Sequence, residues 1–229
     1  MKIKEIIQRI QSLYSKGASS DDSRLSNRFL YSKILTTRAL LLSQEAKKKQ
    51  RISMWNYQTI PCIELIEVPK NECPCIPPRG CSIYRSRHKI PEPLVGLSGA
   101  LIQGVYDMDG TIKIDEQNLN SIRFNSGNKY ATKEPKYFIE SGYLYLVGPK
   151  KLPIVKMVAL FEDPIAVKVF EGYCDNCKDC KKCLDYLEEE FPLDNDMIDA
   201  LVRLISEEVL NIFLQNVDDK RNDTKDDKN

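Results

Sequence analysis

The segment with the clearest chemical potential is CDNCKDCKKC, which places a cysteine at every third position: Cys174, Cys177, Cys180 and Cys183. Thiolates at C-x2-C spacing can hold zinc or an iron–sulfur cluster, because two sulfurs converge on one ion. On a regular helix each three-residue step turns by about −60°, so the four sulfurs would fan across half of the surface. The tetrad is therefore a metal-site candidate only where its segment forms a compact loop.

A second cysteine-rich stretch offers further ligands. Structural zinc sites usually take two ligand pairs from separate segments. The stretch PKNECPCIPPRGC contributes Cys73 and Cys75, with Cys81 or Cys62 as a further ligand. Reduced thiols are the competing interpretation, because no export signal is recognisable and a reducing compartment disfavours disulfides. A metal ion held by four sulfur ligands has no open coordination position, so such a site would be structural and not catalytic. We expect no cofactor, with zinc as the alternative.

Catalytic signatures are missing from the chain. His88 is the one histidine in 229 residues, and we expect it in a solvated basic strand or loop rather than as a general base. The sequence contains no G-x-S-x-G elbow, no P-loop motif and no G-x-G-x-x-G after a predicted strand. We therefore expect a protein that is not an enzyme.

Two basic segments leave nucleic-acid binding open as an alternative. They are KKKQR (47–51) and YRSRHK (84–89), with Trp55 and Tyr84 as aromatic neighbours. Basic residues with aromatics can line a nucleic-acid path, although a helix end and a solvent-facing strand explain them equally well. The net charge of +1, from 34 basic and 33 acidic residues, gives no global field toward DNA or an anionic membrane.

Three segments show the apolar periodicity of helices. Residues 3–14 place apolar side chains at i, i+3, i+4 and i+7. A second helix is predicted from about residue 22 to about residue 51, ending in lysines that suit its dipole. The third covers 191–216, with Asp194 as the N-cap.

The residues between these helices have the composition and spacing that are typical of β-strands. Glycine, proline and β-branched residues separate short apolar segments from residue 54 to about residue 170. The dipeptides DG at 109–110 and SG at 141–142 lie between apolar runs and predict two hairpins. Segments 57–68 and 154–164 predict further strands, giving roughly five to seven in total.

Together the elements predict an α+β fold, with a helical bundle from the N- and C-terminal helices and an inserted, mainly antiparallel β domain. The predicted bundle comprises 1–52 plus 191–217, and the β domain 53–172. A cysteine-rich loop at 173–190 and a disordered charged tail at 218–229 complete the organisation.

The last helix is more apolar than one packing partner requires. Beyond its main stripe, extra apolar residues that include Leu204 and Leu210 widen the apolar arc. We expect Leu204 and Leu210 to lie at an interface with neighbouring subunits.

Several segments together resemble a known family. They are the opening MKIKEIIQRIQSLYSKGASSDDSRLSNRFLYSKILTTRALLLSQEAKKKQ, the segment MWNYQTIPCIELIEV, the hairpin KYFIESGYLYLVG, the strand end LFEDP and the C-terminal PLDNDMIDALVRLISEEVL. The chain is similar over nearly its whole length to a head–tail connector structural protein of crAss-like bacteriophages. None of the segments carries catalytic residues, and the cysteine tetrad is not among them.

The resemblance implies a virion ring protein stacked below the portal. It implies an adaptor-type helical bundle bearing a β domain, in the manner of podovirus tail-tubular proteins. It also implies a homo-oligomeric ring of about twelve copies, with the portal on one side and the next tail ring on the other. Packaged DNA would pass through without its sequence being read, and no membrane would be involved.

Overall fold

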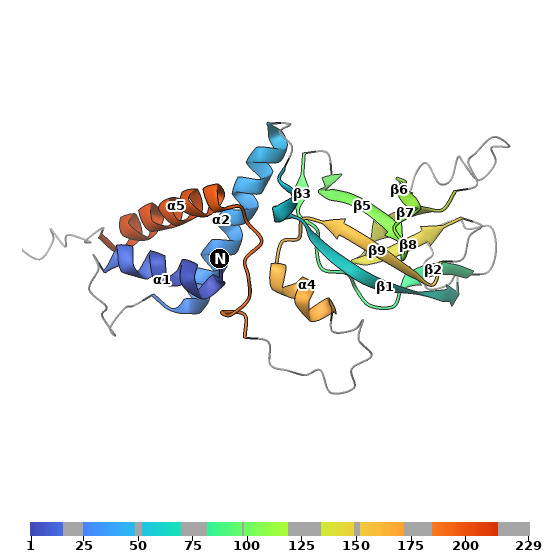
Figure 1. The fold of residues 1–229 in the computed structure, drawn as a ribbon, viewed down its shortest axis with the longest axis horizontal. Helices are drawn as coiled ribbons and strands as arrows, with labels where there is room; N and C mark the ends of the chain where they lie inside the picture. The colour runs from blue at the N-terminus through green and yellow to red at the C-terminus, as the bar shows by residue number, and fades with distance from the viewer. Residues whose placement is uncertain are drawn as a thin grey trace, which may run out of the picture. The chain divides into compact units, whose positions relative to one another are not determined.

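The computed structural model describes residues 1–15, 25–48, 52–69, 82–97, 99–118, 134–148, 152–171 and 185–214, apart from the side chains of 82 and 211–214. The chain divides into two compact units, Met1–Leu41 with Leu187–Asn229, and Leu42–Tyr186. The first is helical and the second is built on strands (Figure 1). Helix α2 (Asn27–Lys47) continues from the first unit into the second.

In the helical unit, α1 (Ile3–Tyr14) and α5 (Asn195–Leu214) pack together although they come from opposite ends of the chain (Figure 1). The reason is that both helices carry an apolar stripe. All the isoleucines of α1 are buried. The buried apolar residues of α5 are Ile198, Leu201, Val202, Ile205 and Val209. Removing these side chains from water is the main driving force for the contact.

A short backbone pairing fastens the segment before α5 to the N-terminus. Lys2 and Glu190 form an isolated antiparallel bridge. The N–H of Ile3 donates to the carbonyl of Glu189 at 3.1 Å, and the N–H of Lys4 donates to that of Leu187 at 2.9 Å. These bonds satisfy N–H groups in the first turn of α1, which have no partner inside the helix.

The second unit is a closed barrel with the strand order β1-β2-β8-β7-β6-β5-β9. The strands are β1 (Gln58–Pro69), β2 (Ser82–Ser86), β5 (Ile102–Asp107), β6 (Lys113–Glu116), β7 (Lys136–Glu140), β8 (Tyr143–Val147) and β9 (Ile154–Ala159). Neighbours are antiparallel except β6 and β7, which are parallel. Closure depends on β9, which pairs with both β1 and β5.

Two short elements accompany the barrel strands. A 3-10 turn, η1 (Met54–Asn56), precedes β1. A separate two-stranded sheet, β3 (Val95–Gly96) with β4 (Gly99–Ala100), precedes β5. Each of these two elements therefore lies just before the first residue of a barrel strand.

The barrel interior is filled by alternating residues of its strands. In β9 every second residue from Val155 to Ala159 is buried. Strand β1 departs from this alternation, because Ile60 and Ile63 are both fully buried. The register shifts between them at a bulge that contains Pro61, and a bulge is a position where a strand tolerates proline.

Both hairpins predicted from glycine dipeptides are confirmed. Strands β5 and β6 pair across the turn with Gly110, and β7 and β8 pair across the turn with Gly142. These glycines have φ of 73° and 82°, and Ser141 has φ of 54°. Glycine adopts such left-handed conformations without the steric cost of a side chain.

Helix α4 (Pro164–Glu171) belongs to the barrel unit. Proline occupies its first position, and Asp163 Oδ1 accepts a hydrogen bond from the N–H of Ile165 at 2.9 Å. Both features are typical helix starts. Val167 and Phe170 are buried in the same cluster as the barrel interior, so the helix is part of the barrel core.

The predicted fold class is wrong. The chain forms a closed seven-stranded barrel with accompanying helices, and not a helical bundle with an inserted antiparallel β domain. Apolar periodicity can identify a strand, but closure depends on pairing between β1 and β9, which are far apart in the sequence. The parallel pairing of β6 with β7 was also unexpected, because parallel neighbours are joined by long crossovers rather than tight turns.

Candidate interaction surface on the helical unit

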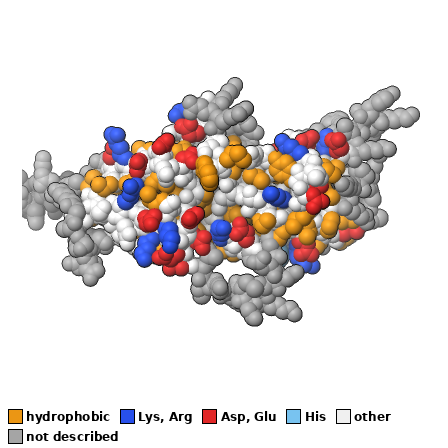
Figure 2. Space-filling model, viewed as in Figure 1, with side chains coloured by type: hydrophobic (Ala, Val, Ile, Leu, Met, Phe, Trp, Pro, Cys, Tyr) orange, Lys and Arg blue, Asp and Glu red, His pale blue; other side chains and the backbone are white. Residues whose placement is uncertain are grey.

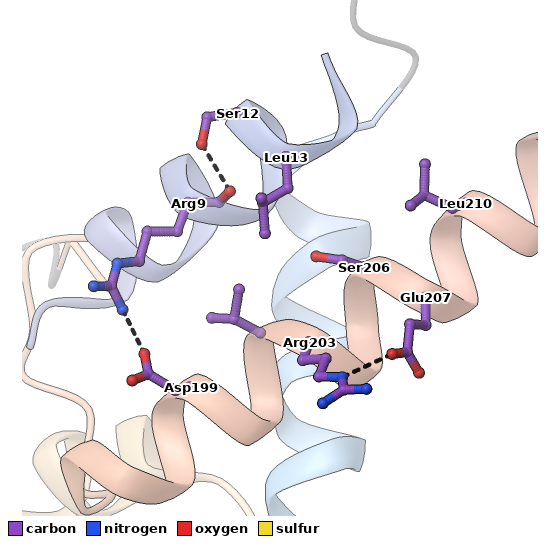
Figure 3. A pocket seen from close by; sticks show the side chains of 9 residues that line it. Arg9, Ser12, Leu13, Asp199, Arg203, Ser206, Glu207 and Leu210 are labelled. Atoms are coloured by element: carbon purple, nitrogen blue, oxygen red, sulfur yellow. Dashed lines mark hydrogen bonds and ion pairs between the residues drawn. The ribbon is translucent and has the colours of Figure 1, made fainter. Parts of the chain in front are cut away.

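An open groove of about 470 Å³ runs between α1 and α5 (Figure 3). Its apolar lining includes Leu13 from α1, which is 53% exposed, and Leu210 from α5, which is half-buried. The complete lining is Arg9, Ser12, Leu13, Asp199, Val202, Arg203, Ser206, Glu207 and Leu210. An apolar depression with polar groups around it is the usual form of a recognition surface.

Ion pairs border this groove (Figure 3). Arg9 of α1 donates to Asp199 of α5 at 3.0 Å, and Arg203 donates to Glu207 one turn further along α5 at 2.9 Å. All four side chains are at least half exposed. Exposed pairs of this kind contribute about 0–1 kcal/mol each. The guanidinium groups therefore stay accessible to a partner molecule.

Ser206 places a buried hydroxyl at the groove. The residue is 9% exposed, and its Oγ has no hydrogen-bond partner among the described residues. Its side chain points from α5 into the space between the two helices (Figure 3). A buried polar atom without a partner costs roughly 1–3 kcal/mol, so a ligand group that donates to Oγ would recover that cost.

Glu188 connects the segment before α5 to the start of α1. Its carboxylate accepts hydrogen bonds from Lys2 Nζ at 2.9 Å and Lys4 Nζ at 3.2 Å. The bond from Lys2, followed by that from Lys4, lowers the pKa of Glu188, and the same contact raises the pKa of Lys2. Glu188 is exposed, so these are surface ion pairs that join the segment before α5 to the first turn of α1.

The two residues predicted to lie at an interface occupy different places. Leu210 lines the groove, whereas Leu204 is 41% exposed and is not part of the lining. Six residues along a helix rotate a side chain by about 240°, so the two leucines lie on different faces of α5. The sequence alone gives no sign of the role of Arg9, Leu13 and Ser206, because these residues form a surface only when α1 pairs with α5.

The predicted metal ligands Cys174, Cys177, Cys180 and Cys183 lie outside the described residues, and the zinc site stays a prediction. Within the described part of the chain, no three histidine, cysteine or acidic side chains gather closely enough to hold a metal ion. Cys62 in β1 is disulfide-bonded, which departs from the expectation of free thiols.

The remaining sequence candidates lie in ordinary positions. His88 is exposed in the segment after β2, in agreement with the expected solvated position. Of the aromatics beside the basic segments, Tyr84 is half-buried in β2 and hydrogen-bonds to Glu67 at 3.1 Å. None of the helices in the described ranges has the length and apolarity required to span a bilayer.

Comparison with known proteins identifies the family. A search of curated proteins gives no significant match. The model of the family CrAss_Ring_2, described as phage tail ring protein 2, matches residues 5–228. Nearly the whole chain is covered, so both the helical unit and the barrel unit fall inside the match. The chain therefore belongs to the phage tail ring protein 2 family of crAss-like phages, and it is a structural component of the virion.

Proposed function

We propose that this ring protein sits at the head–tail junction, as a connector between the portal and the next tail ring, with about twelve copies around the DNA exit channel. In this role it acts mechanically and catalyses no reaction. The observation that carries the proposal is the family match over residues 5–228, together with apolar surface that the described chain leaves uncovered.

The surface chemistry supports close packing of many copies. On the face drawn in Figure 2, basic and acidic side chains are interspersed with hydrophobic ones. The net charge of the chain is +1, so identical copies do not repel one another strongly. A standard interface buries roughly 1,600 Å², and a ring subunit must supply two different patches of that kind. A balanced surface also suits a channel wall that DNA passes without being read.

Electron microscopy of assembled particles tests the position. We expect density for this chain directly between the portal and the tail, with a closed ring of identical copies. A position elsewhere in the tail, or contacts with neither the portal nor a second ring, would contradict the connector role. Free subunits that bind DNA tightly, with a steep dependence on salt, would instead favour the nucleic-acid alternative.

The interface role of the two leucines is tested by substitution. We expect Leu204→Asp and Leu210→Asp each to reduce incorporation into particles while leaving the thermal unfolding of the free subunit nearly unchanged, because both side chains are at least partly exposed. Normal incorporation of both variants would remove these residues from the interface.

A further inference from the structure

A large aromatic side chain stands exposed on an ordered turn. Trp55 is 82% exposed and Met54 is 75% exposed, both within η1. The turn is held in place by its own bonds: Ser53 Oγ accepts from the N–H of Trp55 at 3.4 Å, and the N–H of Tyr57 donates to the carbonyl of Met54 at 3.2 Å. Asn56, next to the tryptophan, is buried. The indole is therefore presented outward by a fixed backbone.

A second exposed pair belongs to the same end of the barrel. Val95 is 62% exposed and Leu97 is 80% exposed, in and beside β3. Strands β1 and β5 both pair with Ala159 at the end of β9, through Gln58 and Ile102. Element η1 directly precedes β1, and the β3–β4 sheet directly precedes β5. Both therefore lie at the same end of the barrel. We call Met54, Trp55, Val95 and Leu97 the apolar end patch.

The groove of the helical unit has the chemistry that an indole requires. Its apolar lining, with Leu13 and Leu210, suits the ring faces. The accessible guanidinium groups of Arg9 and Arg203 can stack on an aromatic face. The Oγ of Ser206, which has no hydrogen-bond partner in the described part of the chain, can accept a hydrogen bond from the indole N–H, which is a donor only.

We propose that Trp55 of one copy inserts into the α1–α5 groove of the next copy, with the rest of the apolar end patch packing around the groove rim. The projecting patch and the receiving groove are different surfaces of the same chain. Their contact is therefore heterologous, which is the type that generates a closed ring. This contact rests on the proposed function in one respect: copies of the chain must meet in a ring. It does not require that the ring touches the portal. An adjacent ring protein in the groove is the competing occupant.

Trp55 is the single tryptophan of the chain, so intrinsic fluorescence reports on it alone. We expect the free subunit to emit like a solvated indole and to be quenched readily by acrylamide. In rings assembled from this chain alone, the emission should shift to shorter wavelength and the quenching constant should fall several-fold. Unchanged emission on assembly would overturn the proposal, and so would a shift that appears only after another tail protein is added.

Photo-crosslinking then identifies the receiving surface. With benzoylphenylalanine in place of Trp55, irradiated rings made from isotopically mixed copies should yield crosslinks between different copies that map to α1 or α5. Crosslinks elsewhere would overturn the proposal. Crosslinks at the groove in a ring that electron microscopy places away from the portal would uphold this contact while contradicting the connector role.

Matched variants separate docking from folding. Trp55→Ala and Leu13→Asp should each abolish ring formation without changing the circular dichroism melt of the free subunit. Met108→Ala is the control, since Met108 is 57% exposed in the turn after β5, at the opposite barrel end, and it should assemble normally. Loss of assembly in all three variants, or in none, would overturn the proposal.

Discussion

The barrel and the helical unit bury their apolar residues in different ways. The barrel closes on itself, so its interior is enclosed by strands that each have two paired neighbours, and α4 adds to the same core. The helical unit depends on stripes that meet between helices, and beside them a groove leaves Leu13 and Leu210 partly open. The barrel therefore encloses its apolar residues within its own strands and α4, whereas the helical unit buries one apolar face and leaves part of another open at the groove.

The largest loss of stability is expected from a substitution in the barrel core. Phe161 is fully buried there, and we expect Phe161→Ala to lower the free energy of unfolding by about 3–5 kcal/mol, because it removes an aromatic ring and leaves a cavity. Urea denaturation followed by circular dichroism measures the loss. Val169→Ala, at an exposed position in α4, should change stability by less than about 0.5 kcal/mol. Equal losses in the two variants would contradict the assignment of Phe161 to the core.

A matching substitution in α5 tests whether the two units unfold separately. Leu201 is fully buried in the helical unit, so Leu201→Ala should cost about 2–5 kcal/mol there. Hydrogen exchange should accelerate in α1 and α5, while amides in β1 and β9 keep their protection. Loss of protection throughout the chain would show that the helices and the barrel unfold as one cooperative unit.

A smaller effect is expected from a polar group that supports the barrel wall. Ser86 is fully buried, donates to the carbonyl of His88 at 2.8 Å and accepts from the N–H of Leu144 at 3.1 Å. Ser86→Ala leaves that N–H without this partner and should cost roughly 1–3 kcal/mol. Thr36→Ala removes an exposed hydroxyl bond on α2 and should cost much less. Similar midpoints in urea for both variants would contradict the role of Ser86.

The smallest effect is expected on the melting temperature at acidic pH. Lys2 and Lys4 lower the pKa of Glu188 below its ordinary value of 4.5, so the contribution of Glu188 to stability is present above that value. It is lost as the pH falls through the lower pKa of the folded state. Glu188→Gln should flatten this part of a melting-temperature profile. An unchanged slope in Glu188→Gln would show that the ion pairs do not affect folding.

Local signals in the sequence predicted local structure well. Helix α1 covers the residues that its isoleucine stripe indicates, and both glycine-containing hairpins form. These features depend on residues close together in the chain. Barrel closure and the groove could not be predicted in this way, because each depends on strands or helices from distant parts of the sequence.

The order of side chains by itself determined the three longest helices, the two glycine-containing hairpins and the similarity to a ring protein family that extends over residues 5–228. It did not reveal helix α4, which lies inside the predicted β domain. Tertiary structure alone decided that the strands close into a barrel and that Trp55 stands exposed at one barrel end. It also decided that Ser206 lies buried at a groove, where no other described residue hydrogen-bonds to its hydroxyl. The physical reason is that periodicity reports which face of an element is apolar, whereas exposure depends on what the rest of the chain places against that face.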